Sequence, residues 1–382
     1  MPQPFTIGLV VNPVAGLGGP CAQKGSDAHD IRQTALAAGV EPQAGLRARR
    51  ALAQLVDRLA HSGRDAVVLT GPGELGADAA AGLCPVEILG AEASGGSASH
   101  GATTAASTRT LAARLRDAGV DLLVFAGGDG TARDVLDAVG ADLPVLGIPA
   151  GVKIYSAVFA LTPVAAGTAA AAWLLSPRRE ATEREVVDID EDALRAGSAS
   201  PAYYGSLQVP VDPTRLQDRK SPTPASDSTA VRTLAGAFAA SMLPGHAYVL
   251  GPGGTTHAVG AALGLDLTRL GVDVVRDGGL LARDVTAGAL EELLADSPAT
   301  IVVTPLGGQG FIVGRGNQQL TRALAKGAPL RVIATPSKLA SLGTRPLRVD
   351  TGSPETDAVL CGYAKVLTGP GTETVYPVGN AG

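Results

Sequence analysis

The chain has 382 residues, of which 45% are hydrophobic and 18% are charged, and its formal net charge is −5. This length exceeds what one hydrophobic core usually serves, so we expect two domains. No basic stripe is present, which argues against nucleic-acid binding, and no uncharged apolar run of about 18 residues is present, which argues against a membrane protein. The three cysteines are far apart and predict neither a disulfide framework nor a zinc site. The N-terminal residues lack the pattern of a signal peptide, so a cytoplasmic protein is expected.

Short apolar runs alternate with helical patterns in the first half of the chain. Runs rich in β-branched residues predict buried strands at residues 7–11, 66–70, 122–126 and 145–148. Apolar residues at helical spacing predict helices at residues 105–117, 134–139 and 165–175. This alternation predicts an α/β fold with a parallel sheet.

The second half mixes strands and helices and shows no internal repeat. Strands are predicted at residues 186–189, 247–250, 272–275, 300–303, 331–334 and 347–349, and helices at residues 256–263 and 287–295. We place the domain boundary in a charged stretch near residue 178. Residues 1–178 would form an N-terminal α/β domain, and residues 179–382 a mixed, strand-rich α/β domain whose last segment could return to the first domain.

The strongest functional signal is a glycine loop, Gly127-Gly128-Asp129-Gly130-Thr131, between a buried strand and a helix. Glycines let a ligand approach the backbone N–H groups, and the helix N-terminus adds partial positive charge, so the loop suits a phosphate. A carboxylate beside phosphates, here Asp129, either anchors a metal ion or takes a proton from an attacking hydroxyl. The alternative is a tight turn in which Asp129 only caps the helix.

Two further strand ends in the first half carry candidate ligand residues. Asn12 stands in the turn after the first strand, and Lys153 stands in the loop after the strand at residues 145–148. For Lys153 the alternative is a solvated lysine on a connecting loop. Ligands sit at the carboxyl ends of parallel strands, so these turns and the Asp129 loop predict one crevice.

In the second half, one glycine turn precedes a predicted helix and contains Gly253, Thr255 and Thr256. Hydroxyls and N–H groups at a helix start suit a second phosphate or a ribose. A capped turn without a ligand is the alternative.

A second glycine-rich loop, at residues 307–321, contains Gln309, Arg315 and Asn317. The planar fork of an arginine suits a phosphate, and side-chain amides can read an adenine edge. A hairpin with a solvated tip is the alternative, although loops of this composition tend to bind ligands.

Long motifs support a resemblance to a known family. The motifs are GLVVNPVAGLGG, GGDGTARD, GIPAGVK, VVDIDEDALRAG, YYGSLQVP, GPGGTTHAVGAALGL and TPLGGQGFIVGRGNQQLT. From about Gly8 to Thr368 the chain resembles the ATP-NAD kinase family that includes the acetoin-catabolism protein X, within the NAD kinase and diacylglycerol kinase superfamily.

The resemblance implies a Rossmann-like N-terminal domain of the NAD kinase/diacylglycerol kinase type. It implies phosphoryl transfer from ATP or polyphosphate, with Mg²⁺, to the 2′-hydroxyl of the NAD adenosine ribose, which gives NADP. Asp129 would be the base that activates this hydroxyl, and Gly127, Gly128, Gly130 and Thr131 would lie around the phosphates. A homo-oligomer is also implied, while the metal ligands stay unassigned.

One departure from the family pattern concerns the acceptor. Typical NAD kinases have an Asn-Glu pair that grips the nicotinamide-side ribose, and this chain has no such dipeptide. Lipid kinases have that pair shortly after GGDGT, where this chain has Arg133 and Asp134. Arg133 could clamp a phosphate, and Asp134 could hold a metal ion or a hydroxyl.

Two alternatives therefore stay open. One is a kinase for another hydroxyl substrate, such as a polyol, a lipid or a specialised metabolite. The other is a non-catalytic regulator that binds NAD or another nucleotide. The carboxylate of Asp129 argues against the regulator, because binding alone has less need of a carboxylate beside phosphates.

Overall fold

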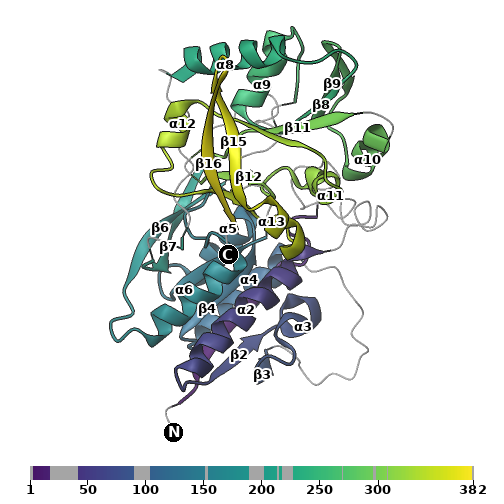
Figure 1. Ribbon diagram of the computed structural model, residues 1–382. Coiled ribbons are helices and arrows are strands. Elements are labelled where there is room, and N and C mark those ends of the chain that lie inside the picture. The colour runs from purple at the N-terminus through teal and green to yellow at the C-terminus, as the bar shows by residue number, and fades with distance from the viewer. Residues whose placement is uncertain are drawn as a thin grey trace.

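The computed structural model describes most of the chain and contains two large sheets, one above the other (Figure 1). The described residues are 3–17, 42–89, 104–150, 154–188, 202–212, 215–216, 227–268, 270–295, 298–307 and 309–380. The N-terminal end lies at the foot of the lower sheet, and the last strand ends near the junction between the two parts (Figure 1).

Within the described residues the first sheet has five parallel strands in the order β3-β2-β1-β4-β5. Its strands are β1 (Phe5–Val11), β2 (Ala66–Thr70), β3 (Val86–Ile88), β4 (Leu122–Gly127) and β5 (Val145–Pro149). Every residue of β4 and β5 is buried. Parallel strands that are covered on both faces are apolar throughout, and this explains the continuous apolar runs in the sequence.

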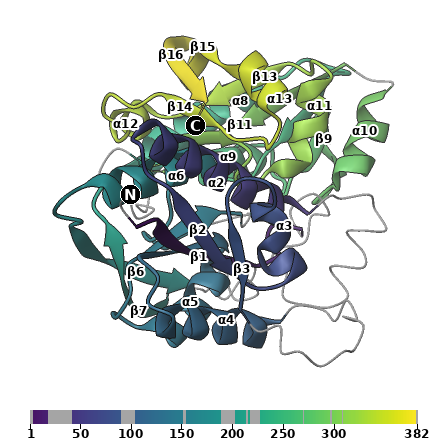
Figure 2. The ribbon, with the colours of Figure 1, turned by 90° about the horizontal axis from the view of Figure 1, so that it is seen from below.

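Helices cover both faces of the first sheet. On one face lie α2 (Gln43–His61) and α6 (Pro163–Leu175), and on the other α4 (Ala105–Asp117) and α5 (Asp129–Val139) (Figure 2). Thr104 and Thr162 cap α4 and α6, because the side chain of each accepts a hydrogen bond from a first-turn amide. The 3₁₀ turn η2 (Gly73–Leu75) and the short α3 (Ala77–Ala80) follow β2.

An antiparallel pair, β6 (Ala181–Asp188) and β7 (Ala202–Pro210), packs against this first part. Val186, Leu207 and Val209 are fully buried in the same apolar core as β1 and β4. The domain division near residue 178 stays a prediction, and the pair that follows it contributes its apolar side chains to the first core.

The second sheet is mixed, and within the described residues it has the order β10-β9-β8-β11-β13-β15-β16-β14-β12. Its strands are β8 (Ala247–Leu250), β9 (Asp273–Arg276), β10 (Gly279–Ala282), β11 (Ala299–Val303), β12 (Phe311–Val313), β13 (Leu330–Ile333), β14 (Leu347–Val349), β15 (Gly362–Gly369) and β16 (Thr372–Asn380). The neighbours β8, β11, β13 and β15 run parallel, so their carboxyl ends share one edge.

Helices accompany this sheet on both sides. They are α8 (Ser228–Ala240), α9 (Gly254–Ala262), α10 (Ala287–Ala295), η4 (Gln318–Leu320), α11 (Thr321–Ala325), α12 (Pro336–Ala340) and α13 (Pro354–Leu360). Leu234 and Phe238 of α8 belong to one core cluster, and Leu290 of α10 and Leu324 of α11 belong to another. Across the described ranges, we find no helix whose length and hydropathy would let it cross a membrane.

This architecture confirms the predicted α/β fold, with a parallel first sheet and a strand-rich second part. Helix α5 begins at Asp129, five residues before its predicted start at residue 134. Glycine lowers helix propensity, which hid this first turn in the sequence. Strand β6 begins at Ala181 within the charged stretch, because pairing with β7 leaves its alternate side chains in contact with solvent.

Candidate active site

The glycine loop joins the end of β4 to the N-terminus of α5, with Gly128 as the N-cap residue and Asp129 as the first helical residue. A Cβ atom on Gly127 would lie 2.3 Å from Oγ1 of Thr131, so only glycine fits against that side chain. Gly130 has open space around its Cβ position. The loop therefore presents backbone, rather than side chains, at a helix N-terminus, as a phosphate site requires.

Asn12 joins this loop from the neighbouring strand. Its Nδ2 donates a hydrogen bond to Thr131 Oγ1 at 2.9 Å, and its Oδ1 accepts one from the Val14 amide at 3.2 Å. The backbone N–H of Asn12 also donates to the Ala126 carbonyl at 2.9 Å. Two of the predicted ligand turns are thus in direct contact at the carboxyl edge of the first sheet.

The carboxylate of Asp129 is buried, with 6% of the residue exposed, and it accepts two backbone hydrogen bonds. The Tyr155 amide donates to Oδ2 at 2.8 Å, and the Ser156 amide donates to Oδ1 at 3.0 Å. The pKa of Asp129 is raised from 3.8 to about 7, mainly by burial and in small part by the nearby Asp188, against the opposing effect of the hydrogen bonds from Ser156 and Tyr155. A carboxyl with a pKa near neutral pH is suited to general-base chemistry.

Ser156 fixes the segment that carries these two amides. Its Oγ donates to the Val187 carbonyl at 2.8 Å and accepts from the Val187 amide at 3.0 Å. The segment is therefore attached to β6 as well as to Asp129. This role could not be predicted from the sequence, because backbone amides are common to almost every residue type.

Arg133 and Asp134 point from α5 to neighbouring elements. Arg133 forms an ion pair with Asp188 at 2.9 Å, and its guanidinium lies 4.1 Å from the centre of the Tyr204 ring. Asp134 forms an ion pair with Arg109 of α4. Lys153, the remaining candidate of the first half, lies outside the described residues.

In the second part, Gly253 is the N-cap residue of α9, and Thr255 and Thr256 lie in its first turn, both buried. Thr256 Oγ1 donates to the Gly253 carbonyl at 2.9 Å. Thr304, which directly follows β11, donates to Thr255 Oγ1 at 3.2 Å and accepts from Lys338 Nζ at 2.8 Å. A polar cluster therefore lies at the carboxyl ends of β8, β11 and β13.

The loop with Gln309, Arg315 and Asn317 touches the first part of the chain. Gln309 Nε2 donates to the Ile154 carbonyl at 3.5 Å, and Arg315 donates to the Leu161 carbonyl at 2.7 Å. Asn317 closes its own loop, since it accepts from the Gly314 amide at 2.8 Å and donates to the Ile312 carbonyl at 2.9 Å. The loop therefore reaches the residues on either side of Tyr155 and Ser156.

A divalent cation would find few ligands in the protein itself. Among the described residues, no group of three or more His, Cys, Asp or Glu side chains is placed to hold a metal ion. In phosphoryl-transfer sites, Mg²⁺ is usually held by one or two carboxylates together with the phosphates of the substrate. Near the loop, Asp129 accepts two backbone amides and Asp188 pairs with Arg133, so the phosphates of the donor would supply most of the ligands of Mg²⁺.

Two protein-family models match the chain. The ATP-NAD kinase N-terminal domain matches residues 7–175, which include the glycine loop, and the ATP-NAD kinase C-terminal domain matches residues 243–378, which include the α9 turn and the 307–321 loop. No curated protein and no solved structure gave a significant match. Together the two models cover most of the chain, and the chain belongs to the ATP-NAD kinase family.

Proposed function

We propose that this protein transfers a phosphoryl group from ATP or polyphosphate to the 2′-hydroxyl of the NAD adenosine ribose and so forms NADP. Family membership supports phosphoryl transfer. The observation that carries the proposal is Asp129, a buried carboxyl with a pKa of about 7 at the start of a glycine-lined helix. A cytoplasmic homo-oligomer stays a prediction.

In this mechanism the phosphates of the donor lie over the loop from Gly127 to Thr131, where N–H groups and the α5 N-terminus offset their charge. The acceptor hydroxyl attacks the terminal phosphorus in line as the bond to the leaving phosphate oxygen breaks. Asp129 takes the hydroxyl proton and later releases it to solvent. The products are the phosphorylated acceptor and the shortened donor. When bound with the donor, Mg²⁺ would neutralise part of the phosphate charge.

We assign roles to other candidate residues from their positions and contacts. Asn12 supports the phosphate loop through Thr131. Gly253, Thr255 and Thr256 offer N–H groups and hydroxyls at the start of α9, and we assign them to a ribose or a second phosphate. Gln309 and Asn317 would shape the acceptor side of the site, and Lys153 stays a predicted phosphate contact.

A different hydroxyl acceptor is the second candidate, and the absence of an Asn-Glu dipeptide favours it. On this alternative the phosphate loop and Asp129 act in the same way, while the acceptor pocket differs. A polyol, a lipid or a specialised metabolite would then replace NAD.

The test is NADP formation from NAD with Mg²⁺, first with ATP and then with polyphosphate, for the wild type and for Asp129→Asn. We expect turnover by the wild type and a reduction of about 10²-fold or more in the variant, the range that loss of a general base usually costs. If the wild type forms no NADP but phosphorylates another alcohol, that alcohol is the acceptor in place of NAD. Equal activity of the two proteins would exclude Asp129 as the base.

A further inference from the structure

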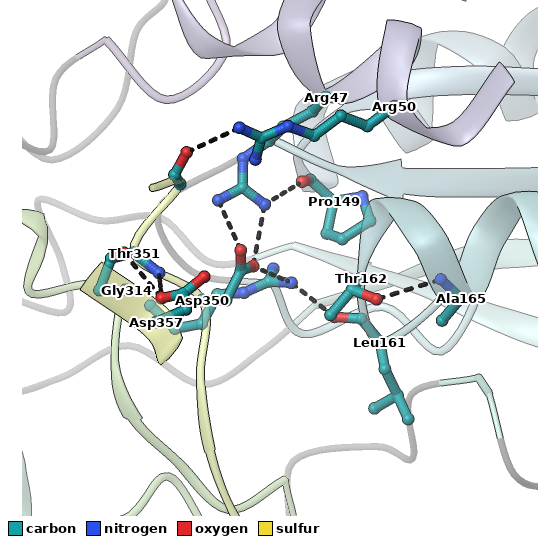
Figure 3. Close-up of polar contacts among 12 residues, drawn as sticks. Arg47, Arg50, Pro149, Leu161, Thr162, Ala165, Gly314, Asp350, Thr351 and Asp357 are labelled. Carbon is teal, nitrogen blue, oxygen red and sulfur yellow. Dashed lines mark hydrogen bonds and ion pairs between the residues drawn. The ribbon is translucent and has the colours of Figure 1, made fainter. Parts of the chain in front are cut away.

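A buried carboxylate, Asp350, lies between two buried guanidinium groups at the junction of the two parts (Figure 3). Arg47 of α2 forms two hydrogen bonds with it, Nη1 to Oδ2 at 2.8 Å and Nη2 to Oδ1 at 3.0 Å. Arg315 Nη2 lies 3.1 Å from the same Oδ2. Arg47, Arg315 and Asp350 are 8%, 7% and 7% exposed, so solvent screens these charges poorly.

Arg47, Arg315 and Asp350 form a cluster with two positive charges and one negative charge, so its stability depends on the Asp350 carboxylate. Burial lowers the pKa of Arg315 to about 10, and the Asp350 carboxylate opposes this shift. Removal of one partner from a buried ion pair leaves an uncompensated charge and is strongly destabilising. Gly314, with φ of 95°, allows the close approach of the Arg315 loop, since a Cβ there would lie 1.8 Å from the Asp350 carbonyl oxygen.

The same two arginines also hold backbone carbonyls of the first part. Arg47 Nη1 donates to the Pro149 carbonyl at 3.2 Å (Figure 3). Arg315 Nη2 donates to the Leu161 carbonyl at 2.7 Å. Pro149 and Leu161 lie on either side, in sequence, of Tyr155 and Ser156. Those two residues donate the amide hydrogen bonds to the Asp129 carboxylate.

We propose that Arg47, Asp350 and Arg315 are positioning residues, which hold the Tyr155 and Ser156 amides on the Asp129 carboxylate by fixing the chain on both sides of them. The cluster joins both parts of the chain. The protonation of Asp129 therefore depends on the position of the second part against the first. The expected effect on catalysis rests on the proposed function of Asp129, whereas the expected effect on the hydrogen bonds to its carboxylate does not.

The expected effect on Asp129 has a definite sign. The two amide hydrogen bonds favour the charged carboxylate and so lower its pKa, against burial and against Asp188 of β6, which is itself paired with Arg133 of α5. If the cluster is loosened, these hydrogen bonds lengthen and the pKa of Asp129 rises further. The ionised base then forms only at higher pH.

The test uses Arg47→Lys and Arg315→Lys, which keep the charge but lose the planar fork. Arg179→Lys is the matched control, because Arg179 pairs with Asp121 at 2.9 Å and touches neither Pro149 nor Leu161. The Asp129 carboxyl is titrated by NMR in protein labelled with ¹³C at aspartate side chains, and Asp129→Asn identifies its signal. The pH profile of NADP formation is measured in parallel.

We expect the pKa of Asp129 to rise by about one unit in Arg47→Lys and Arg315→Lys, the size expected when one charge-assisted hydrogen bond weakens. The acidic limb of the rate should move by the same amount, and Arg179→Lys should leave both unchanged. Folded variants with an unshifted Asp129 titration would overturn the proposal. If Arg47→Lys or Arg315→Lys does not fold, Asp350→Glu is measured in its place, with the same expected rise in the pKa of Asp129. Because the titration needs no turnover, a wild type without NADP formation would refute the proposed function and leave this test intact.

Discussion

Replacing Asp129 by asparagine should stabilise the protein at alkaline pH while strongly reducing its activity. The folded state binds one more proton than the unfolded state between the ordinary carboxyl pKa of 3.8 and the folded value of about 7. Stability of the wild type therefore falls as the pH rises through this window and levels off above it. Asparagine does not ionise and removes this dependence.

The magnitude follows from the size of the shift. A rise of about three units corresponds to about 4 kcal/mol of destabilisation once the carboxyl is ionised. Asparagine has one carbonyl oxygen for the two amides of Tyr155 and Ser156, and the lost hydrogen bond costs about 1–3 kcal/mol. At high pH the variant should therefore be more stable than the wild type by about 1–3 kcal/mol.

The assay is urea unfolding followed by tryptophan fluorescence. Trp173, the one tryptophan of the sequence, is buried in α6 within the core of the part that carries Asp129. Between about pH 5 and about pH 8.5, the stability difference between variant and wild type should change by about 3 kcal/mol in favour of the variant. A difference that stays constant over this range would refute the burial argument for Asp129.

Three further variants test the phosphate loop. Gly127→Ala should destabilise the fold by about 1–3 kcal/mol in urea unfolding, because the new Cβ would meet Thr131. Gly130→Ala should be neutral or stabilising by about 0.5–1 kcal/mol, because the space around that Cβ position is open. Yet Gly130→Ala should weaken ATP binding in calorimetry, if phosphates approach the loop backbone; unchanged affinity would contradict that placement. Asn12→Ala should lower stability by about 1 kcal/mol, since it removes the Thr131 hydrogen bond, and should raise KM for the donor in steady-state kinetics more than Asp129→Asn does.

The local parts of the fold could be predicted from the sequence. Continuous apolar runs located β2 and β8 at their observed bounds, and helical periodicity did the same for α4 and α10. Helix α2 was not predicted, although Ala48, Leu52, Leu55 and Leu59 recur at helical spacing, because arginines interrupt the pattern. One of them, Arg47, is buried for its ion pair with Asp350.

Some contacts of the candidate site could likewise be predicted from the sequence, and others could not. Asn12 and the Asp129 loop were predicted to meet because ends of parallel strands share an edge, and the structure puts Asn12 in contact with Thr131. The partners of Asp129 are backbone amides, which carry no residue-specific signal. Arg47 and Asp350 are 303 positions apart, and nothing local in either segment indicates the other.

Asp129 is the proposed base for phosphoryl transfer to NAD. The most direct measurement is transfer of ³²P from γ-labelled ATP to NAD, with Mg²⁺, by the wild type and Asp129→Asn side by side. We predict labelled NADP that carries the phosphate on the 2′-oxygen, and a rate about 10²-fold or more lower in the variant. Labelled NADP formed at equal rates by both proteins would contradict the role of Asp129 as the base. A folded wild type that binds both substrates but forms no labelled NADP would contradict phosphoryl transfer to NAD.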